Sequence, residues 1–254
     1  MKKYSALTAL FLFFLATQVT FADSRSDFDF QYSKYRQYYS EFSLYRKDYF
    51  TNPTLDNQQK ALITGKQAIN TRDLTKASFA SYVKDLILID NQKYEPMMPI
   101  VGNLVTAQQF FLSEAAKGQS IVTVSDMETF NTEYQVAYPV HERSIKVGIV
   151  AHKVAKLKYL VNAQQTALKS LKDKIPNTVS VRVTERIAVL EANLQIITEK
   201  VDNMATYLNT EESMENADSE VFFTSKVEQL AAIRSLQLDW MEQLIDLDIN
   251  YGKI

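Results

Sequence analysis

The chain has 254 residues, of which 28 are basic and 30 acidic, and it contains no cysteine. The lack of cysteine excludes disulfides, thiolate metal sites, a cysteine nucleophile and a lipid-modified N-terminal cysteine. With a net charge of −2, the chain lacks the overall positive charge of nucleic-acid-binding proteins, so we expect no nucleic-acid partner. Only five glycines and five prolines are present. Because sheet proteins need frequent turns built from these residues, the composition predicts long helices.

The N-terminus has the layout of a secretory signal peptide. A basic start at Lys2 and Lys3 precedes an apolar run over residues 6–16, and small residues lie three and one positions before a predicted cleavage after Ala22. The run is shorter than the roughly 20 residues of a membrane-spanning helix, although an uncleaved anchor is the alternative. We therefore expect residues 1–22 to be a signal peptide and the protein to be exported, to the periplasm, the cell surface or the exterior. We expect no transmembrane segment in the mature chain.

Aromatic residues dominate the first predicted helix, over residues 27–50. At 100° per residue, nine of its ten aromatics fall within an arc of roughly 140°, and some repeat every seven residues. We interpret these aromatics as a seam that packs in a hairpin core or, alternatively, forms a platform that stacks on sugars or an aromatic ligand. The candidate ligand or packing positions of this seam are Phe28, Tyr32, Tyr35, Tyr39, Phe42 and Tyr49.

Short breaks separate the following helices. The sequence Asn52-Pro53-Thr54 ends the first helix and caps a second over residues 55–90, which predicts an antiparallel hairpin. A break at 95–99 precedes a shorter helix over residues 100–116, closed by Gly118.

A long helix is predicted to begin at a capping box over residues 125–128 and to run to Lys172, with Pro139 kinking or splitting it. Two strand-like patches, at 120–124 and 178–181, either pair as a small ribbon or serve as helix-entry segments.

Heptad spacing marks the C-terminal half. Apolar residues follow one another at steps of four and three, and Val189 and Ile196 widen the stripe. The seam consists of Val183, Ile187, Leu190, Leu194, Ile197, Val201, Met204 and Leu208. A last helix over residues 219–251 carries an apolar face from Phe223 to Tyr251.

These elements predict an all-α fold: an elongated antiparallel helical bundle of five or six helices with coiled-coil-like heptad seams. We place an aromatic-rich hairpin at residues 23–95 and a long-helix bundle at residues 96–254, and we expect the two to pack as one unit.

Motifs for chemistry are missing. His141 and His152 lie eleven residues apart, or about 16 Å along a helix, and cannot ligate one ion. There is no nucleophile elbow, phosphate loop or dinucleotide fingerprint. We therefore expect no catalytic residue, no metal site and no cofactor, and a protein that is not an enzyme.

Charge is unevenly distributed, with basic residues in one segment and a run of acids between residues 201 and 225. Neighbouring helices with complementary solvated faces explain this pattern, or the basic residues contact an anionic envelope polymer or a lipid surface. The candidate anion-contact stripe consists of Arg143, Lys146, Lys153 and Lys156.

The sequence YRQYYSEFSLYRKDYF, from Tyr35 to Phe50, followed by NPTLDNQQKAL, resembles uncharacterised exported all-α proteins of bacteria. The resemblance covers the first hairpin and brings no activity or functional residue. Our leading hypothesis is an exported non-enzymatic scaffold or interaction protein, which binds another protein or itself. The alternatives are a bundle that binds an apolar or aromatic ligand and a membrane-active helical protein of the pore-forming type.

Overall fold

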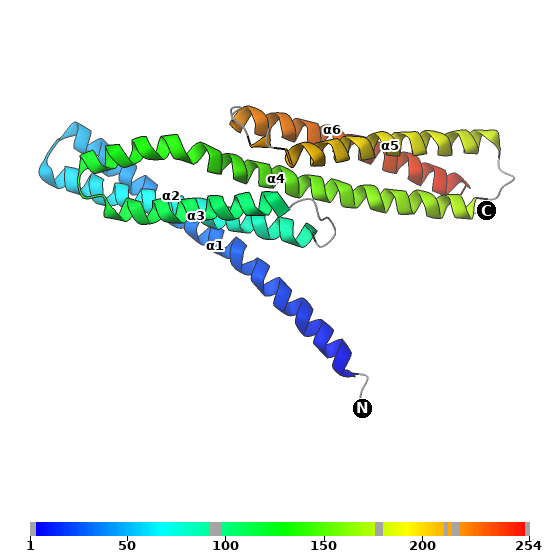
Figure 1. Ribbon diagram of the computed structural model, residues 1–254, viewed down its shortest axis with the longest axis horizontal. Helices are drawn as coiled ribbons and strands as arrows, with labels where there is room; N and C mark the ends of the chain where they lie inside the picture. The colour runs from blue at the N-terminus through cyan, green and yellow to red at the C-terminus, as the bar shows by residue number, and fades with distance from the viewer. Residues whose placement is uncertain (1–3, 92–97, 176–179, 211–212, 215–218, 252–254) are drawn as a thin grey trace. The chain divides into compact units, whose positions relative to one another are not determined.

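Six α-helices make up the described part of the chain in the computed structural model (Figure 1). They are α1 (Tyr4–Thr51), α2 (Leu55–Asn91), α3 (Met98–Ser120), α4 (Val124–Lys174), α5 (Val181–Leu208) and α6 (Ser219–Tyr251). The structure describes residues 4–91, 98–175, 180–210, 213–214 and 219–251, with side chains from residue 24 onward except those of residues 90 and 91. These residues contain no strand. The predicted all-α helical bundle is confirmed.

Several predicted features lie at the edge of the described residues or outside them. The helical backbone of α1 continues through the predicted cleavage position after Ala22, whereas the side chains of the predicted signal peptide are outside the described residues. Residues 95–97 of the predicted break and residues 178–179 of the strand-like patch at 178–181 are also outside them. The other patch, at 120–124, forms the short connection from α3 into α4, as a helix-entry segment would.

Two units divide the chain. The N-terminal unit comprises residues 1–88 and 101–145, and the C-terminal unit comprises residues 89–100 and 146–254. Residues 101–145 thus cluster with the first hairpin, whereas the sequence predicts them to be part of the long-helix bundle. The helix α4 contributes its first part to one unit and its second part to the other.

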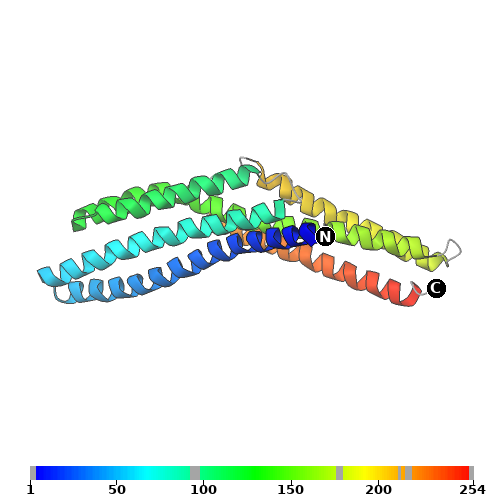
Figure 2. The ribbon, with the colours of Figure 1, turned by 90° about the horizontal axis from the view of Figure 1, so that it is seen from below.

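In the N-terminal unit, α2 is the central helix. Its buried positions between residues 68 and 83 are mostly alanine, serine and threonine, which allow neighbouring helices to approach closely. The helix α1 runs antiparallel along it (Figure 2): Phe28 meets Phe79 with ring centroids 4.9 Å apart, and Phe42 lies against Gly65. None of the side chains of α1 described from residue 24 onward is buried, so α1 lies on the outside of its unit.

The caps that start α2 and α4 use side-chain oxygens. Thr54 accepts a hydrogen bond from the backbone N–H of Asn57 at 3.2 Å, as the predicted cap requires. The helix α4 begins earlier than the predicted box at 125–128. Thr123 accepts from the N–H of Asp126, and the Asp126 carboxylate accepts in return from the N–H of Thr123 at 2.8 Å. The capping box therefore consists of Thr123 and Asp126. The aspartate three residues after the capping threonine accepts the return hydrogen bond that glutamate accepts in the usual capping box.

Three helices pack in the C-terminal unit, with α5 antiparallel to α4 and α6. As the residue number increases along α4, the number of the partner residue in α5 decreases: Lys158 bonds Asp202 and Lys172 bonds Glu191. In contrast, α4 and α6 run parallel, since Lys146 bonds Glu220 and Gln164 bonds the carbonyl of Gln237. Of the two effects predicted for Pro139, a kink or a split, the split is wrong, because α4 is one helix through Pro139.

The heptad seam of α5 forms the core of this unit. All its members are buried except Ile187, which is half-buried. The expectation that Val189 and Ile196 widen this stripe is wrong: their side chains are 53% and 48% exposed. Both lie on the side of α5 that borders α6, where they line open surface pockets together with residues of α6.

A layer of two glutamines interrupts this apolar core. Gln164 and Gln237 are both buried, and the Gln237 amide donates to the carbonyl of Leu157 at 3.1 Å while the Gln164 amide donates to the carbonyl of Gln237 at 3.2 Å. Because each side chain reaches a specific carbonyl on the neighbouring helix, the layer fixes the register of α4 against α6.

Gly118 has a different role from the predicted helix stop. It lies inside α3, and no described glycine has a positive φ. A Cβ built at Gly118 would lie 2.6 Å from the Cγ2 atom of Ile69, so glycine there permits the close approach of α3 and α2. Gly102, in the same helix, has nothing within 4 Å of such a Cβ.

We expect Gly102→Ala to stabilise the protein by about 0.5–1 kcal/mol, because alanine favours the helix at an open position. We expect Gly118→Ala to be destabilising, because the β-branched Ile69 cannot rotate away freely. Urea unfolding followed by circular dichroism measures both. Equal gains from the two variants would contradict the close approach.

Candidate functional site

The aromatic seam of α1 has an inner row and an outer edge. The inner row repeats every seven residues, is half-buried and faces α2; its members are Phe28, Tyr35, Phe42 and Tyr49. The outer edge is exposed and also repeats every seven residues through Tyr32, Tyr39 and Arg46. Phe50, 70% exposed, ends this edge with the Arg46 guanidinium 5.3 Å from its ring centre. We call Tyr32, Tyr39, Arg46 and Phe50 the aromatic edge.

The outer edge is held in place by rings of the inner row. Phe28 and Tyr32 stack with centroids 5.9 Å apart, and Tyr35 and Tyr39 are tilted at 5.7 Å. Aromatic side chains have only two rotatable bonds, so such neighbours fix them at small entropic cost. The edge therefore presents ordered rings to solvent.

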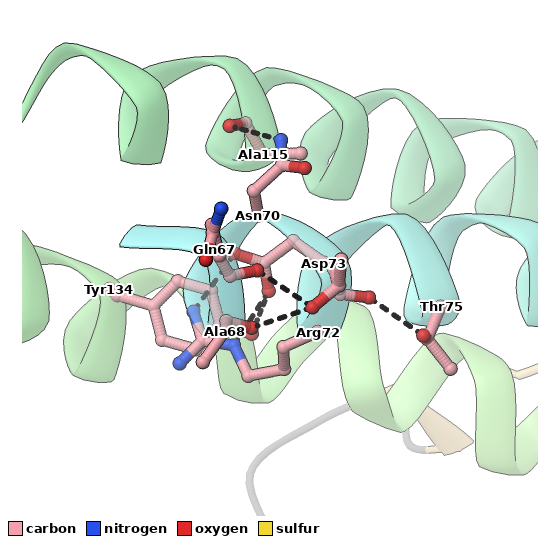
Figure 3. Close-up of polar contacts among 9 residues, drawn as sticks. Gln67, Ala68, Asn70, Arg72, Asp73, Thr75, Ala115 and Tyr134 are labelled. Carbon is pink, nitrogen blue, oxygen red and sulfur yellow. Dashed lines mark hydrogen bonds and ion pairs between the residues drawn. The ribbon is translucent and has the colours of Figure 1, made fainter. Parts of the chain in front are cut away.

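Beneath the inner row lies a buried polar cluster that sequence reasoning missed (Figure 3). Asp73 of α2 is fully buried and receives two hydrogen bonds of 2.9 Å from the Arg72 guanidinium. The Tyr134 hydroxyl of α4 donates to the same carboxylate at 3.0 Å, and the Arg72 guanidinium lies 3.8 Å from the Tyr134 ring centre. Asn70, on the other side of α2, donates to the carbonyl of Ala115 in α3 at 3.0 Å.

Burial and charge shift the pKa values in this cluster. Burial, followed by the nearby charge of Asp73, raises the pKa of the Tyr134 hydroxyl well above its usual value. Burial opposes the charge of Arg72, but the hydrogen bonds and charge of Asp73 outweigh it and raise its pKa. Tyr35 has a raised pKa, mainly through burial and then through Tyr39. Tyr134 thus stays a hydrogen-bond donor, and Arg72 stays a cation, across the physiological range.

A second cation lies over the neighbouring rings. The Lys76 ammonium is 4.8 Å from the ring centre of Tyr138 and 5.3 Å from that of Phe111, while Tyr134 and Tyr138 stack at 5.2 Å. The rings and cations of α2, α3 and α4 satisfy one another in this way. The arrangement fixes the helices on which α1 rests, and a ligand is not needed to complete it.

His141 joins the same unit as an aromatic ring. It stacks on Phe110 with centroids 4.0 Å apart, and burial lowers its pKa although the charge of Glu114 acts in the opposite direction. A group with a lowered folded pKa contributes stability above its unfolded pKa and loses it as the pH falls. We expect the N-terminal unit to lose stability as the pH falls below about 6.5.

The variant His141→Phe keeps an aromatic ring that can stack on Phe110 and removes the titratable imidazole. Its free energy of unfolding, measured in urea by circular dichroism at pH 7.5 and 5.5, is expected to fall less between these values than that of the unchanged chain. The same loss in both proteins would show that His141 does not cause the pH dependence.

The candidate anion-contact stripe is divided between different environments. Arg143 is buried, and Lys146 bonds Glu220, whereas Lys153 and Lys156 are exposed. Two further lysines of the basic segment, Lys158 and Lys172, bond acids of α5. Complementary faces of neighbouring helices therefore account for much of the charge pattern.

One sequence pattern on α4 indicates a part of the buried cluster. Phe130, Tyr134 and Tyr138 follow one another at four-residue steps, which marks an aromatic stripe on α4. The pair Arg72-Asp73 gave no such signal, because adjacent opposite charges are common on solvated helix faces.

Among the residues that the structure describes, no three histidine or acidic side chains come together as a metal site would require, and no helix has the length and apolarity to cross a membrane. Comparisons with protein families, with curated proteins and with solved structures found no match to this chain.

Proposed function

We propose that the protein is an exported, non-enzymatic interaction protein that binds a partner protein through the aromatic edge of α1. The observation that carries the proposal is the exposure of this edge: Tyr32 and Tyr39 are 46% and 53% exposed although both belong to an ordered row of rings. Tyrosine, phenylalanine and arginine are the residues enriched at protein interfaces. A solvent-facing helix has no need of them for folding.

The position of α1 supports this function. The helix lies outside its unit, and its inner row contacts α2 through Phe28 and Phe42. The buried cluster around Asp73 fixes α2 against α4, so the edge is presented on a rigid support. Rigid aromatic surfaces bind with a small loss of conformational entropy.

Site-specific photocrosslinking in the producing cell tests the interaction. A photoreactive phenylalanine analogue at Tyr39 is expected to form a discrete covalent adduct with a partner protein. Gln37 is the matched control, because it is exposed on the same helix and lies about 160° away around the axis. Absence of an adduct at Tyr39, or equal adducts at both positions, would contradict the proposal.

Export is tested separately by N-terminal sequencing of the protein recovered outside the cytoplasm. The predicted first residue is Asp23, because the expected cleavage follows Ala22. A protein that retains residues 1–22 and stays inside the cytoplasm would contradict export.

A further inference from the structure

A surface groove runs along α5 and α6 within the C-terminal unit. Three stretches of about 420, 160 and 460 Å³ are lined by both helices. They adjoin, because Leu236 lines the first two and Gln243 lines the last two. The exposed apolar side chains of Val189 and Ile196 lie in this groove, seven residues apart.

The α5 side of the groove has the spacing of a second heptad row. Arg182, Val189, Ile196 and Asn203 follow one another at seven-residue steps and all line the groove. The first heptad seam of α5 is buried in the core of the unit. A second row beside it is the geometry that receives the side chains of a further helix.

An apolar ridge lies on the opposite side of α6. Leu238, Met241 and Ile245 are spaced by three and four residues and are 39–53% exposed. Leu238 and Ile245 each come two residues after a groove-lining residue, Leu236 and Gln243, which is a rotation of about 200° around the helix. One chain therefore carries a ridge and a groove on opposite sides of the same helix.

The charges of the two surfaces are complementary. Four basic and two acidic residues line the groove, with Lys200 and Lys226 at one end and Arg186 paired with Asp246 of the same copy. The helix α6 contains six acidic and two basic residues, and Glu242 and Asp248 flank Ile245 on the ridge. An acidic amphipathic helix fits this groove, and α6 of a second copy is such a helix.

We propose that copies of this protein assemble head to tail, with the α6 ridge of one copy in the α5–α6 groove of the next. The two surfaces differ, so the contact is heterologous and leaves a free groove at one end and a free ridge at the other. This assembly uses the C-terminal unit and is independent of the aromatic edge of α1, whose crosslinking neither supports nor excludes it.

The test is the mass of the purified full chain by sedimentation and light scattering, from about 1 to 100 μM. The mass of the unchanged protein is expected to rise with concentration and to fall with added salt. Ile245→Glu on the ridge and Ile196→Glu in the groove are each expected to weaken association at least tenfold. Val136→Glu is the control, because Val136 is 82% exposed in the N-terminal unit.

Mixing the two variants distinguishes this assembly from other contacts. Ile245→Glu keeps an intact groove and Ile196→Glu keeps an intact ridge, so an equimolar mixture is expected to form a dimer that does not extend. A monomeric mixture, or an unchanged protein that stays monomeric throughout, would overturn the proposal and indicate another occupant of the groove. Leu238→Glu replaces the ridge variant if Ile245→Glu loses the helical circular dichroism signal.

Discussion

Replacing Asp73 with alanine is expected to lower the free energy of unfolding by about 3–5 kcal/mol. The Asp73 side chain is fully buried, and its loss leaves the Arg72 guanidinium and the Tyr134 hydroxyl without their shared acceptor. The Arg72 side chain is 23% exposed, so most of it is left buried without an opposite charge, which is costly in a folded protein. Urea unfolding followed by circular dichroism measures the loss.

Two variants show whether this loss has the proposed origin. Asp56→Ala removes an exposed partner of Lys60 from the same helix, so it is expected to lower the free energy of unfolding far less than Asp73→Ala does. The triple variant Arg72→Met, Asp73→Leu and Tyr134→Phe removes the whole polar group and is expected to recover most of the stability. A triple variant as unstable as Asp73→Ala would mean that the cluster stabilises the fold in another way.

Replacing Trp240 with alanine is expected to cost a similar amount, about 3–5 kcal/mol, in the C-terminal unit. Trp240 is 1% exposed in the core between α5 and α6, and its indole N–H donates to the carbonyl of Leu190 at 2.8 Å. The variant creates a large cavity and loses this contact between the helices. Unfolding in urea, again followed by circular dichroism, gives the change.

Val221→Ala is the control for this second variant, because Val221 belongs to the same helix and is 63% exposed. We expect it to change the free energy of unfolding by less than about 0.5 kcal/mol. A small effect of Trp240→Ala would show that α6 does not pack on α5 as described.

Helical periodicity predicted most of the fold, because long helices repeat their apolar contacts many times. The heptad seam from Val183 to Leu208 was identified almost residue for residue, and the cap at Thr54 was located from three residues of sequence. Periodicity does not show which apolar positions have a neighbour. Periodicity therefore places Val189 and Ile196 in the core, although they line a surface groove.

Contacts between helices that are far apart in the sequence could not be predicted from local residue spacing. The bond from Tyr134 to Asp73 joins residues 61 positions apart, and local spacing does not give the relative rotation of α2 and α4. Gly118 predicts a helix stop because glycine is common at helix ends, yet a Cβ atom at this position would meet the side chain of Ile69 on another helix. Such close approaches depend on tertiary packing alone.

The aromatic edge of α1 is proposed as a contact surface, and its contribution to folding tests that proposal most directly. The measurement compares the free energies of unfolding of two double variants, Tyr32→Ala with Tyr39→Ala on the edge and Phe28→Ala with Phe42→Ala in the inner row. The edge pair is expected to cost less than about 1 kcal/mol and the inner pair at least about 2 kcal/mol. An edge pair that costs as much as the inner pair would contradict the account, because those rings would then belong to the fold.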